Sequence, residues 1–154
     1  GVAAIVPVIA RRTDKHLAQA AMKRADRWRR IAHEASQQSR RSDVPAIADP
    51  MKLVECVKSA SNVRRVVLAE QERGTTLRGF MEEAIAGAGA EMPELEIAIG
   101  LEGGWASEEA ALFPRAGTRP CRTAFSARAR EAVPVSGDVD AGEVHAFRLR
   151  RWGE

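Results

Sequence analysis

Residues 95–105 of this chain read LEIAIGLEGGW, and residues 106–109 continue directly with ASEE. The short apolar run predicts a strand, the three glycines that follow predict a tight loop, and Ser107 with two glutamates predicts the start of a helix. Glycines in such a loop allow positive φ and a close approach of backbone N–H groups to a ligand, and the helix start adds a partial positive charge. The stretch is therefore either a ligand-binding loop or a plain connection, and the rest of the chain has to decide.

Alternating strand and helix patterns surround this stretch. Residues 2–9 form a β-branched apolar run that Pro7 is expected to shorten, and residues 64–70 form a second apolar run. Between them, residues 16–39 carry apolar side chains at three- and four-residue spacing, which predicts an amphipathic helix, and residues 77–86 predict another. Strands that alternate with helices favour an α/β fold with a mostly parallel sheet.

Helix caps and breakers predict the smaller elements. Asp49 and Pro50 predict a helix start, with aspartate as the cap and proline at the first position. Ser107 is expected to cap a short helix that Pro114 ends. Residues 144–149 alternate weakly in polarity, which predicts a terminal strand.

Composition bounds both the size and the chemistry of the protein. The chain has 154 residues with 45% hydrophobic side chains, enough for one globular domain with one core. Its net charge is +3, and the basic side chains crowd the N-terminal third, so a phosphate backbone is a permitted partner. The two cysteines and three histidines lack the spacing of a disulfide framework or a metal site, which predicts no metal and a cytoplasmic location. No apolar run reaches membrane-spanning length, so no membrane partner is expected.

Three blocks of sequence carry a family likeness. The first runs from Lys23 to Ile47 and ends in EASQQSRRSDVPAI at residues 34–47, the second is IAIGLEGGW at residues 97–105, and the third is RAREAVP at residues 128–134. In this order they resemble the RsmE-type 16S rRNA uridine-N3 methyltransferases of the SPOUT superfamily. The first block is similar to the family's Glu-Ala-x-x-Gln-Ser/Cys-x-Arg-x-x-Val-Pro-x-Ile without a gap. The second has Leu101 where the family's glycine-rich loop has proline, and the third matches the family's last motif only remotely.

The resemblance implies a fold and a domain organisation. Residues 1–154 would form a SPOUT methyltransferase domain, an α/β unit whose mostly parallel sheet is flanked by helices and ends in a C-terminal trefoil knot. We expect the chain to lack the family's amino-terminal PUA-like RNA-binding barrel, together with the first strand and helix of the catalytic domain. Because family members pair with each site at the subunit interface, a homodimer is expected.

The resemblance also implies a cofactor, a partner and site residues. S-adenosylmethionine would be held by two loops and by the segment from Cys121 onward, the loops being Leu68, Ala69 and Glu70, and Gly100, Leu101, Glu102, Gly103 and Gly104. Arg128 and Glu131 are the positions that best match the family's Arg-x-Glu motif, which would help to remove the uridine N3 proton or stabilise the developing charge. The partner would be 16S rRNA or the small ribosomal subunit, whose phosphates would contact Arg24, Arg27, Arg30, Arg40 and Arg41.

Alternatives stay open at this point. The chain is an active enzyme, or a catalytically impaired SPOUT-fold protein that binds rRNA or dimerises, or a truncated product whose last motif has lost its order. Glu102 either serves the function or satisfies amides of its own loop. A dinucleotide-binding oxidoreductase is disfavoured, because the glycine-rich loop lacks the Gly-x-Gly-x-x-Gly spacing.

Overall fold

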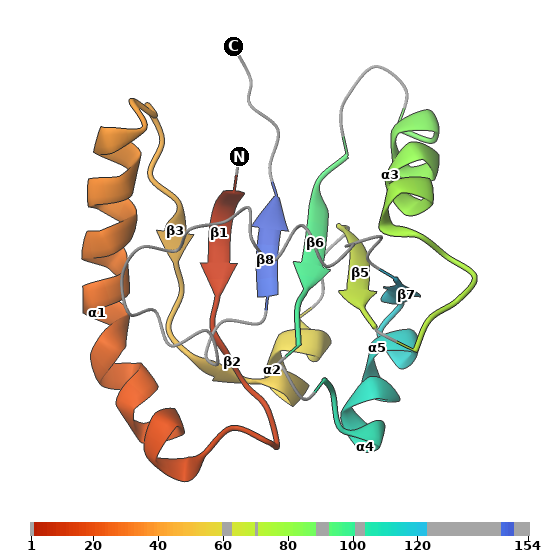
Figure 1. Cartoon of the computed structure of the whole chain (residues 1–154), viewed down its shortest axis with the longest axis horizontal. Helices are drawn as coiled ribbons and strands as arrows, with labels where there is room; N and C mark the ends of the chain where they lie inside the picture. The colour runs from red at the N-terminus through yellow and green to blue at the C-terminus, as the bar shows by residue number, and fades with distance from the viewer. Residues whose placement is uncertain are drawn as a thin grey trace.

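The computed structural model describes residues 2–59, 63–69, 71–88, 93–100 and 104–122, together with the backbone of residues 146–149. In this part of the chain, six strands form one sheet in the order β3-β1-β8-β6-β5-β7 (Figure 1). Its strands are β1 (Val2–Val6), β3 (Ala46–Ile47), β5 (Arg64–Leu68), β6 (Leu95–Ala98), β7 (Arg119–Cys121) and β8 (Ala146–Leu149). A separate ladder pairs β2 (Val8–Ile9) with β4 (Met51–Lys52). The helices are α1 (Lys15–Gln38), α2 (Leu53–Lys58), α3 (Leu77–Ala86), α4 (Ser107–Ala110) and α5 (Leu112–Arg115).

Most strand pairings are parallel. β1 pairs with β3, and β5 pairs with both β6 and β7, all in parallel register. β8 runs antiparallel to its neighbours β1 and β6, so these two strands point in the same direction. The predicted α/β fold with a mostly parallel sheet is therefore confirmed, as are the two long helices and the terminal strand.

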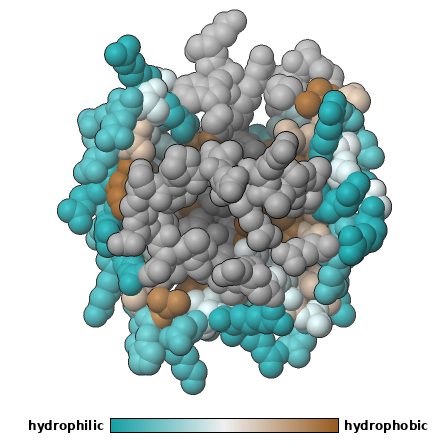
Figure 2. Space-filling view, in the orientation of Figure 1, coloured by the Kyte–Doolittle hydropathy of each residue, from teal (hydrophilic) through white to brown (hydrophobic). Residues whose placement is uncertain are grey.

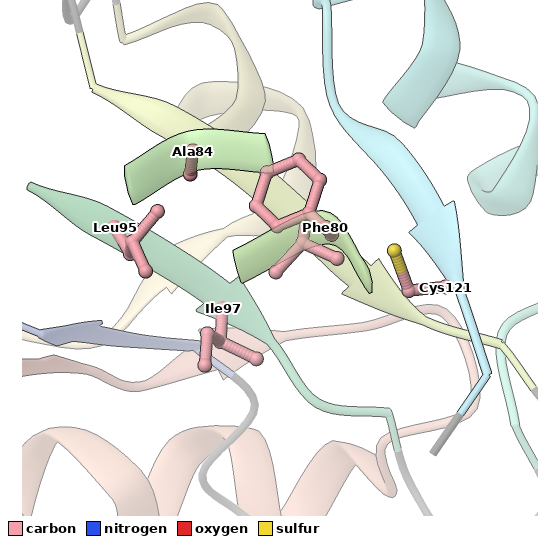
Figure 3. Close-up of a cluster of buried hydrophobic side chains, with 6 residues drawn as sticks. Phe80, Ala84, Leu95, Ile97 and Cys121 are labelled. Atoms are coloured by element: carbon pink, nitrogen blue, oxygen red, sulfur yellow. The ribbon is translucent and has the colours of Figure 1, made fainter. Parts of the chain in front are cut away.

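The strands at the centre of the core bury side chains on both faces of the sheet. In β5, Val66 and Val67 follow one another and point to opposite faces, as the period of a strand requires. The face of Val66 is covered by α3, and Figure 3 shows its other apolar side chains, which are Phe80, Ala84, Leu95, Ile97 and Cys121. The face of Val67 is covered by α2 and α5, and the buried apolar side chains that pack there are Val8, Leu53, Cys56 and Phe113. Because both faces are covered, a near-continuous apolar run is the sequence that such a strand needs.

The sequence predicts a strand break at Pro7 and a helix start at Pro50, and the structure confirms only the first. Pro7 divides the first apolar run into β1 and β2, as predicted from its missing N–H. The predicted helix start at Asp49 and Pro50 is wrong, because α2 begins only at Leu53. The intervening residues 51–52 pair with β2, and the Asp49 carboxylate accepts a hydrogen bond from Arg29 Nη2 at 2.6 Å instead of capping a helix.

The helix predicted from Ser107 to Pro114 consists of two short helices. The N-cap of α4 is Ala106, one residue earlier than predicted, and Glu109 accepts the Ala106 N–H at 3.1 Å. Pro114 lies inside α5 and does not end the helical segment. It occupies the third position of α5, where a backbone N–H has no partner within the helix, so its ring costs no hydrogen bond.

A buried ion pair ties α2 to the sheet. Arg65 of β5 and Glu96 of β6 are register partners, and Arg65 Nε lies 3.3 Å from Glu96 Oε2. Only 9% of the Arg65 side chain and 16% of the Glu96 side chain are exposed. The same guanidinium donates to the carbonyl of Val57 at 3.2 Å and to that of Ser59, at the end of α2. One charged group therefore joins two strands and a helix end.

We predict that Glu96→Ala lowers the free energy of unfolding by about 3 kcal/mol, because it leaves the buried Arg65 guanidinium without its counter-charge. Urea denaturation measures the loss. The control is Glu82→Ala, whose pair with Arg78 is exposed and four residues apart along α3, and it should change stability by less than about 0.5 kcal/mol. Equal losses in the two variants would contradict the role of the buried pair.

Candidate functional site

Three parallel strands end side by side at one edge of the sheet. β5 lies between β6 and β7 and is parallel to both, so the chain leaves all three strands at the same edge, which we call the carboxyl edge (Figure 1). Residues that follow the strands there are Ala69, Ile99 with Gly100, and Arg122. Chain order runs from β5 to β6 and then back past β5 to β7, so the direction of winding reverses at this point. Open α/β sheets bind ligands at such reversals.

The loop after β5 bends towards the end of β7. Ala69 donates its N–H to the carbonyl of Cys121 at 2.9 Å, and Arg122 donates to the carbonyl of Thr75 at 2.8 Å. Within the loop, the Glu72 carboxylate accepts the N–H groups of Gly74 at 2.7 Å and Thr75 at 3.2 Å. These two hydrogen bonds lower the pKa of Glu72 below its ordinary value. Glu72 is therefore ionised at neutral pH and holds the shape of the loop, which makes it a poor base.

The glycine-rich loop is closed at its base by an indole ring. A Cβ atom on Gly100 would lie 2.9 Å from Trp105 Nε1, so only glycine lets the two ends of the loop approach this closely. The Trp105 ring in turn packs edge-on against Phe113 of α5, with centroids 4.8 Å apart. Gly104 has φ of +66°, and no described heavy atom lies within 4 Å of the position of a Cβ there. Among the described residues, none packs against the Cα of Gly104.

A buried carboxylate fixes the helix that follows the loop. Glu109, which is 8% exposed, accepts the N–H of Arg11 through Oε1 at 2.6 Å and the N–H of Ala106 through Oε2 at 3.1 Å. Next to it, the exposed Glu108 pairs with the Arg11 guanidinium. Glu109 therefore holds the backbone of Arg11 and Glu108 its side chain, so two consecutive residues of α4 fix one residue that follows β2.

A small cavity lies on the α2 and α5 face of the sheet. Its volume is about 20 Å³, which is room for one water molecule. Apolar side chains line most of it, and its polar lining is Arg65, Glu96 and Thr118. The Thr118 hydroxyl is buried and has no hydrogen-bond partner among the described residues. A nucleoside needs a far larger pocket than this cavity.

The basic helix α1 lies at the β3 edge of the sheet, on the opposite side from β7 (Figure 1). Arg27 and Arg30 are exposed, Arg24 is half-buried, and Figure 2 shows mainly hydrophilic residues along this side of the molecule. Arg40, just beyond the helix, is exposed with φ of +52°. Arg41 differs from the others, because its guanidinium is half-buried and donates to the carbonyl of Val2 at 3.0 Å.

Comparison with known proteins gives this geometry a family. Residues 1–124 match the family of RNA methyltransferase domains. The chain belongs to the RNA methyltransferase family. Within curated proteins, it is similar to the ribosomal RNA small subunit methyltransferase E of a Synechocystis strain, with 27% identity over 122 residues.

Solved structures add relatives of this RNA methyltransferase domain. One is a ribosomal RNA small subunit methyltransferase E of Neisseria gonorrhoeae bound to S-adenosylmethionine, with 27% identity, 81% of this chain covered and a TM-score of 0.66. Another is a methyltransferase candidate of Legionella pneumophila in complex with the same cofactor, with 25% identity, 82% of this chain covered and a TM-score of 0.61. The matched region covers 38% of the Synechocystis protein and 47% and 48% of the two solved chains, so the match spans less than half of each.

The structure brings part of the predicted cofactor site together. Leu68 ends β5 and Ala69 follows it, Gly100 follows the neighbouring β6, and Gly104 leads from the glycine-rich loop into α4, so all four lie at the carboxyl edge of the RNA methyltransferase domain. The remaining predicted site residues lie outside the described part of the chain, namely Glu70, Leu101, Glu102, Gly103, Arg128 and Glu131. Their assignments stay predictions.

Sequence reasoning missed the role of Glu109 and the contact with Arg11. A signal was present, because an acid three residues after a helix cap is the pattern of a capping box. The second oxygen of Glu109 goes to a residue 98 positions away, and no local pattern predicts that contact. Similarly, Trp105 was visible only as the end of a loop, whereas it fills the space that Gly100 leaves.

The described residues contain no group of three or more His, Cys, Asp or Glu side chains that could hold a metal ion. None of the helices in that part of the chain combines the length and the apolar character that crossing a bilayer demands.

Substitutions at Gly104 and Gly100 test two separate requirements of the glycine-rich loop, which are positive φ and space for the Trp105 indole. We predict that Gly104→Ala lowers the free energy of unfolding by about 1 kcal/mol, because an alanine side chain disfavours positive φ. Gly100→Ala should cost about 2 kcal/mol, because its methyl group overlaps the Trp105 indole. Urea denaturation of both variants gives the values.

Gly74→Ala is the control for these substitutions, because Gly74 is exposed and is not among the glycines with positive φ. It should stay within about 0.5 kcal/mol of the unsubstituted protein. A Gly100→Ala variant as stable as this control would show that the indole does not close the loop.

Proposed function

We propose that this chain carries the catalytic domain of an S-adenosylmethionine-dependent methyltransferase that modifies N3 of a uridine in 16S ribosomal RNA. The observation that carries the proposal is the carboxyl edge, where a glycine-rich loop and two further strand ends meet in a chain of the RNA methyltransferase family. Two solved relatives at 25% and 27% identity are bound to S-adenosylmethionine, and one of them is a small subunit methyltransferase E.

The residues present fit such a cofactor. No described atom packs against the Cα of Gly104, so a ligand can approach the backbone there, and Leu68 and Ala69 lie at the same carboxyl edge. We assign to the site Leu68, Ala69, Glu70, Gly100, Leu101, Glu102, Gly103 and Gly104. When bound, the cofactor supplies an electrophilic methyl group on a positively charged sulfur.

The task left to the protein is positioning and proton removal. In the reaction, the N3–C bond forms as the S–C bond breaks, and the proton on N3 leaves to a base or to water. Glu72 is a poor candidate for this base, since the N–H groups of Gly74 and Thr75 both bond its Oε1 and lower its pKa. We propose Glu131 as the acceptor of the N3 proton and Arg128 as the group that stabilises the charge developing on the base ring.

The assembly and the setting follow from the same family resemblance. We propose that the segment after β7 completes a SPOUT-type trefoil knot over the carboxyl edge. The active form would be a homodimer that acts on the small ribosomal subunit in the cytoplasm, without a metal.

The exposed face of α1 is proposed to hold the RNA. Lys23, Arg27 and Arg30 are exposed and recur at three- and four-residue spacing, so they form one row along the helix. Arg24 and Arg40 flank this row, and together they would contact phosphates without reading the sequence. Arg29 and Arg41 contribute less, because Arg29 is paired with Asp26 and Asp49 and Arg41 is bound to a backbone carbonyl.

Isothermal titration calorimetry with S-adenosylmethionine tests the cofactor site. We expect saturable binding that Gly100→Ala weakens at least about tenfold, because the displaced indole alters the base of the loop. Glu82→Ala, at an exposed position of α3, is the control and should bind like the unsubstituted protein. A folded protein with no saturable binding would overturn the proposed enzyme.

A second candidate is a member of the same fold that binds rRNA and no longer transfers methyl groups. It is favoured by Leu101, which replaces the proline of the family's loop, and by the remote match of the last motif. Calorimetry separates the two candidates, since this protein would bind rRNA but not the cofactor.

We predict that Arg27→Gln with Arg30→Gln weakens binding to 16S rRNA and leaves cofactor binding unchanged. Filter-binding titrations at several salt concentrations should show a salt slope smaller in magnitude by about 1.5, as expected for two lost phosphate contacts. An unchanged slope would remove this row of α1 from the RNA surface.

A further inference from the structure

The turn between β2 and α1, residues 10–14, is tightly built. Ala10 donates its N–H to Thr13 Oγ1 at 3.0 Å, and Thr13 donates its N–H back to the carbonyl of Ala10 at 3.0 Å. Asp14 then caps α1 by accepting the N–H of His16 at 2.7 Å. The backbone of this turn therefore has one defined shape.

This turn is fastened to the helix after the glycine-rich loop. The buried Glu109 carboxylate divides its two oxygens between Arg11 N–H and Ala106 N–H, and Ala106 stands two residues after Gly104. Burial of a carboxylate is costly unless hydrogen bonds compensate for the lost water, so the two N–H donors must stay in place. β1 points in the same direction as β6, and Figure 1 shows β2 and α4 at the same end of the molecule. Glu109 therefore sets the turn at the rim of the carboxyl edge.

The exposed side chains of the turn and of the start of α1 are basic. Arg11, Arg12 and Lys15 are exposed, and the one acid among them, Asp14, has a carboxylate oxygen engaged in capping α1. The Arg11 guanidinium pairs with Glu108, but 65% of the one side chain and 74% of the other are exposed. Such an exposed pair contributes little to stability, so a phosphate can take the place of Glu108 on Arg11.

We propose that the β2–α1 turn is the RNA phosphate contact next to the cofactor loops, and that Glu109 is the positioning residue that holds it there. The inference rests on the proposed function and deepens it, because it places the backbone of the substrate strand at the carboxyl edge as well as along α1. Arg11 and Arg12 bind phosphates that flank the target nucleotide. Glu109 touches neither RNA nor cofactor and acts through the backbone of Arg11.

A matched pair of charge-neutralising variants tests the positioning role. Glu108→Gln and Glu109→Gln each remove one negative charge beside the same arginine, so a purely electrostatic effect would raise RNA affinity in both. We expect opposite results for the two variants. Glu108→Gln should strengthen binding to 16S rRNA about twofold to threefold, since it frees Arg11 from a competing carboxylate. Glu109→Gln should weaken it at least about fivefold, because its amide NH₂ faces one of the two N–H donors and displaces the turn.

The contact itself is tested by Arg11→Gln with Arg12→Gln. We expect a salt slope smaller in magnitude by about 1.5 and unchanged binding of S-adenosylmethionine. Lys58→Gln with Arg64→Gln is the control for lost charge. These exposed residues lie close in sequence to the start of β5, and the carboxyl edge lies at the other end of that strand. The control should keep the slope of the unsubstituted protein.

Each outcome decides one point. Higher RNA affinity in both glutamate variants would overturn the positioning role of Glu109, and an unchanged slope in the double arginine variant would overturn the phosphate contact. Should Glu109→Gln fail to fold in a urea titration, the double arginine variant still decides the contact. Unsubstituted protein that folds but does not bind S-adenosylmethionine would refute the proposed enzyme, whereas binding of both cofactor and rRNA with unaffected variants would refute only this inference.

Discussion

The parallel pairing of β5 with β6 and β7 is the constraint on which the rest of the molecule depends. It brings three separate chain segments to one edge and buries β5 on both faces. Parallel strands need long crossover connections, and here these are α3 and the α4–α5 segment. The helices therefore serve two purposes, since they cover the sheet and return the chain so that each loop starts beside the others.

The sequence predicted the elements whose signals are local. The long helices and the central strands followed from periodicity and fell within two residues of their predicted bounds. Glycine spacing and family resemblance placed Leu68, Ala69, Gly100 and Gly104 in one site, and the strand order brings them to one edge. The start of α2 was missed, because the pairing of residues 51–52 with β2 depends on a partner more than forty positions away.

The number of basic residues in the sequence says less about RNA binding than the contacts that those residues make in the fold. The basic N-terminal third looks uniform in sequence, yet Arg29 and Arg41 are committed to partners within the fold whereas Arg27 and Arg30 are exposed. Arg65 carries the same charge and is buried at the end of α2. Which arginines can reach a nucleic acid is thus a property of the packing, because each guanidinium finds carbonyls and carboxylates that only the folded chain presents.

The position of β8 has a consequence for how the sheet assembles. In the described part of the chain, β1 and β3 form one parallel group, β6, β5 and β7 form another, and the two groups are joined through β8. β8 comes from the far end of the sequence, and its pairing with β1 closes a loop that spans nearly the whole chain. Closing this loop costs conformational entropy before the pairing of β8 with β1 contributes any favourable energy. Each group of strands can therefore form by closing shorter chain segments. Joining the two groups through β8 is the step with the largest entropic cost in this topology.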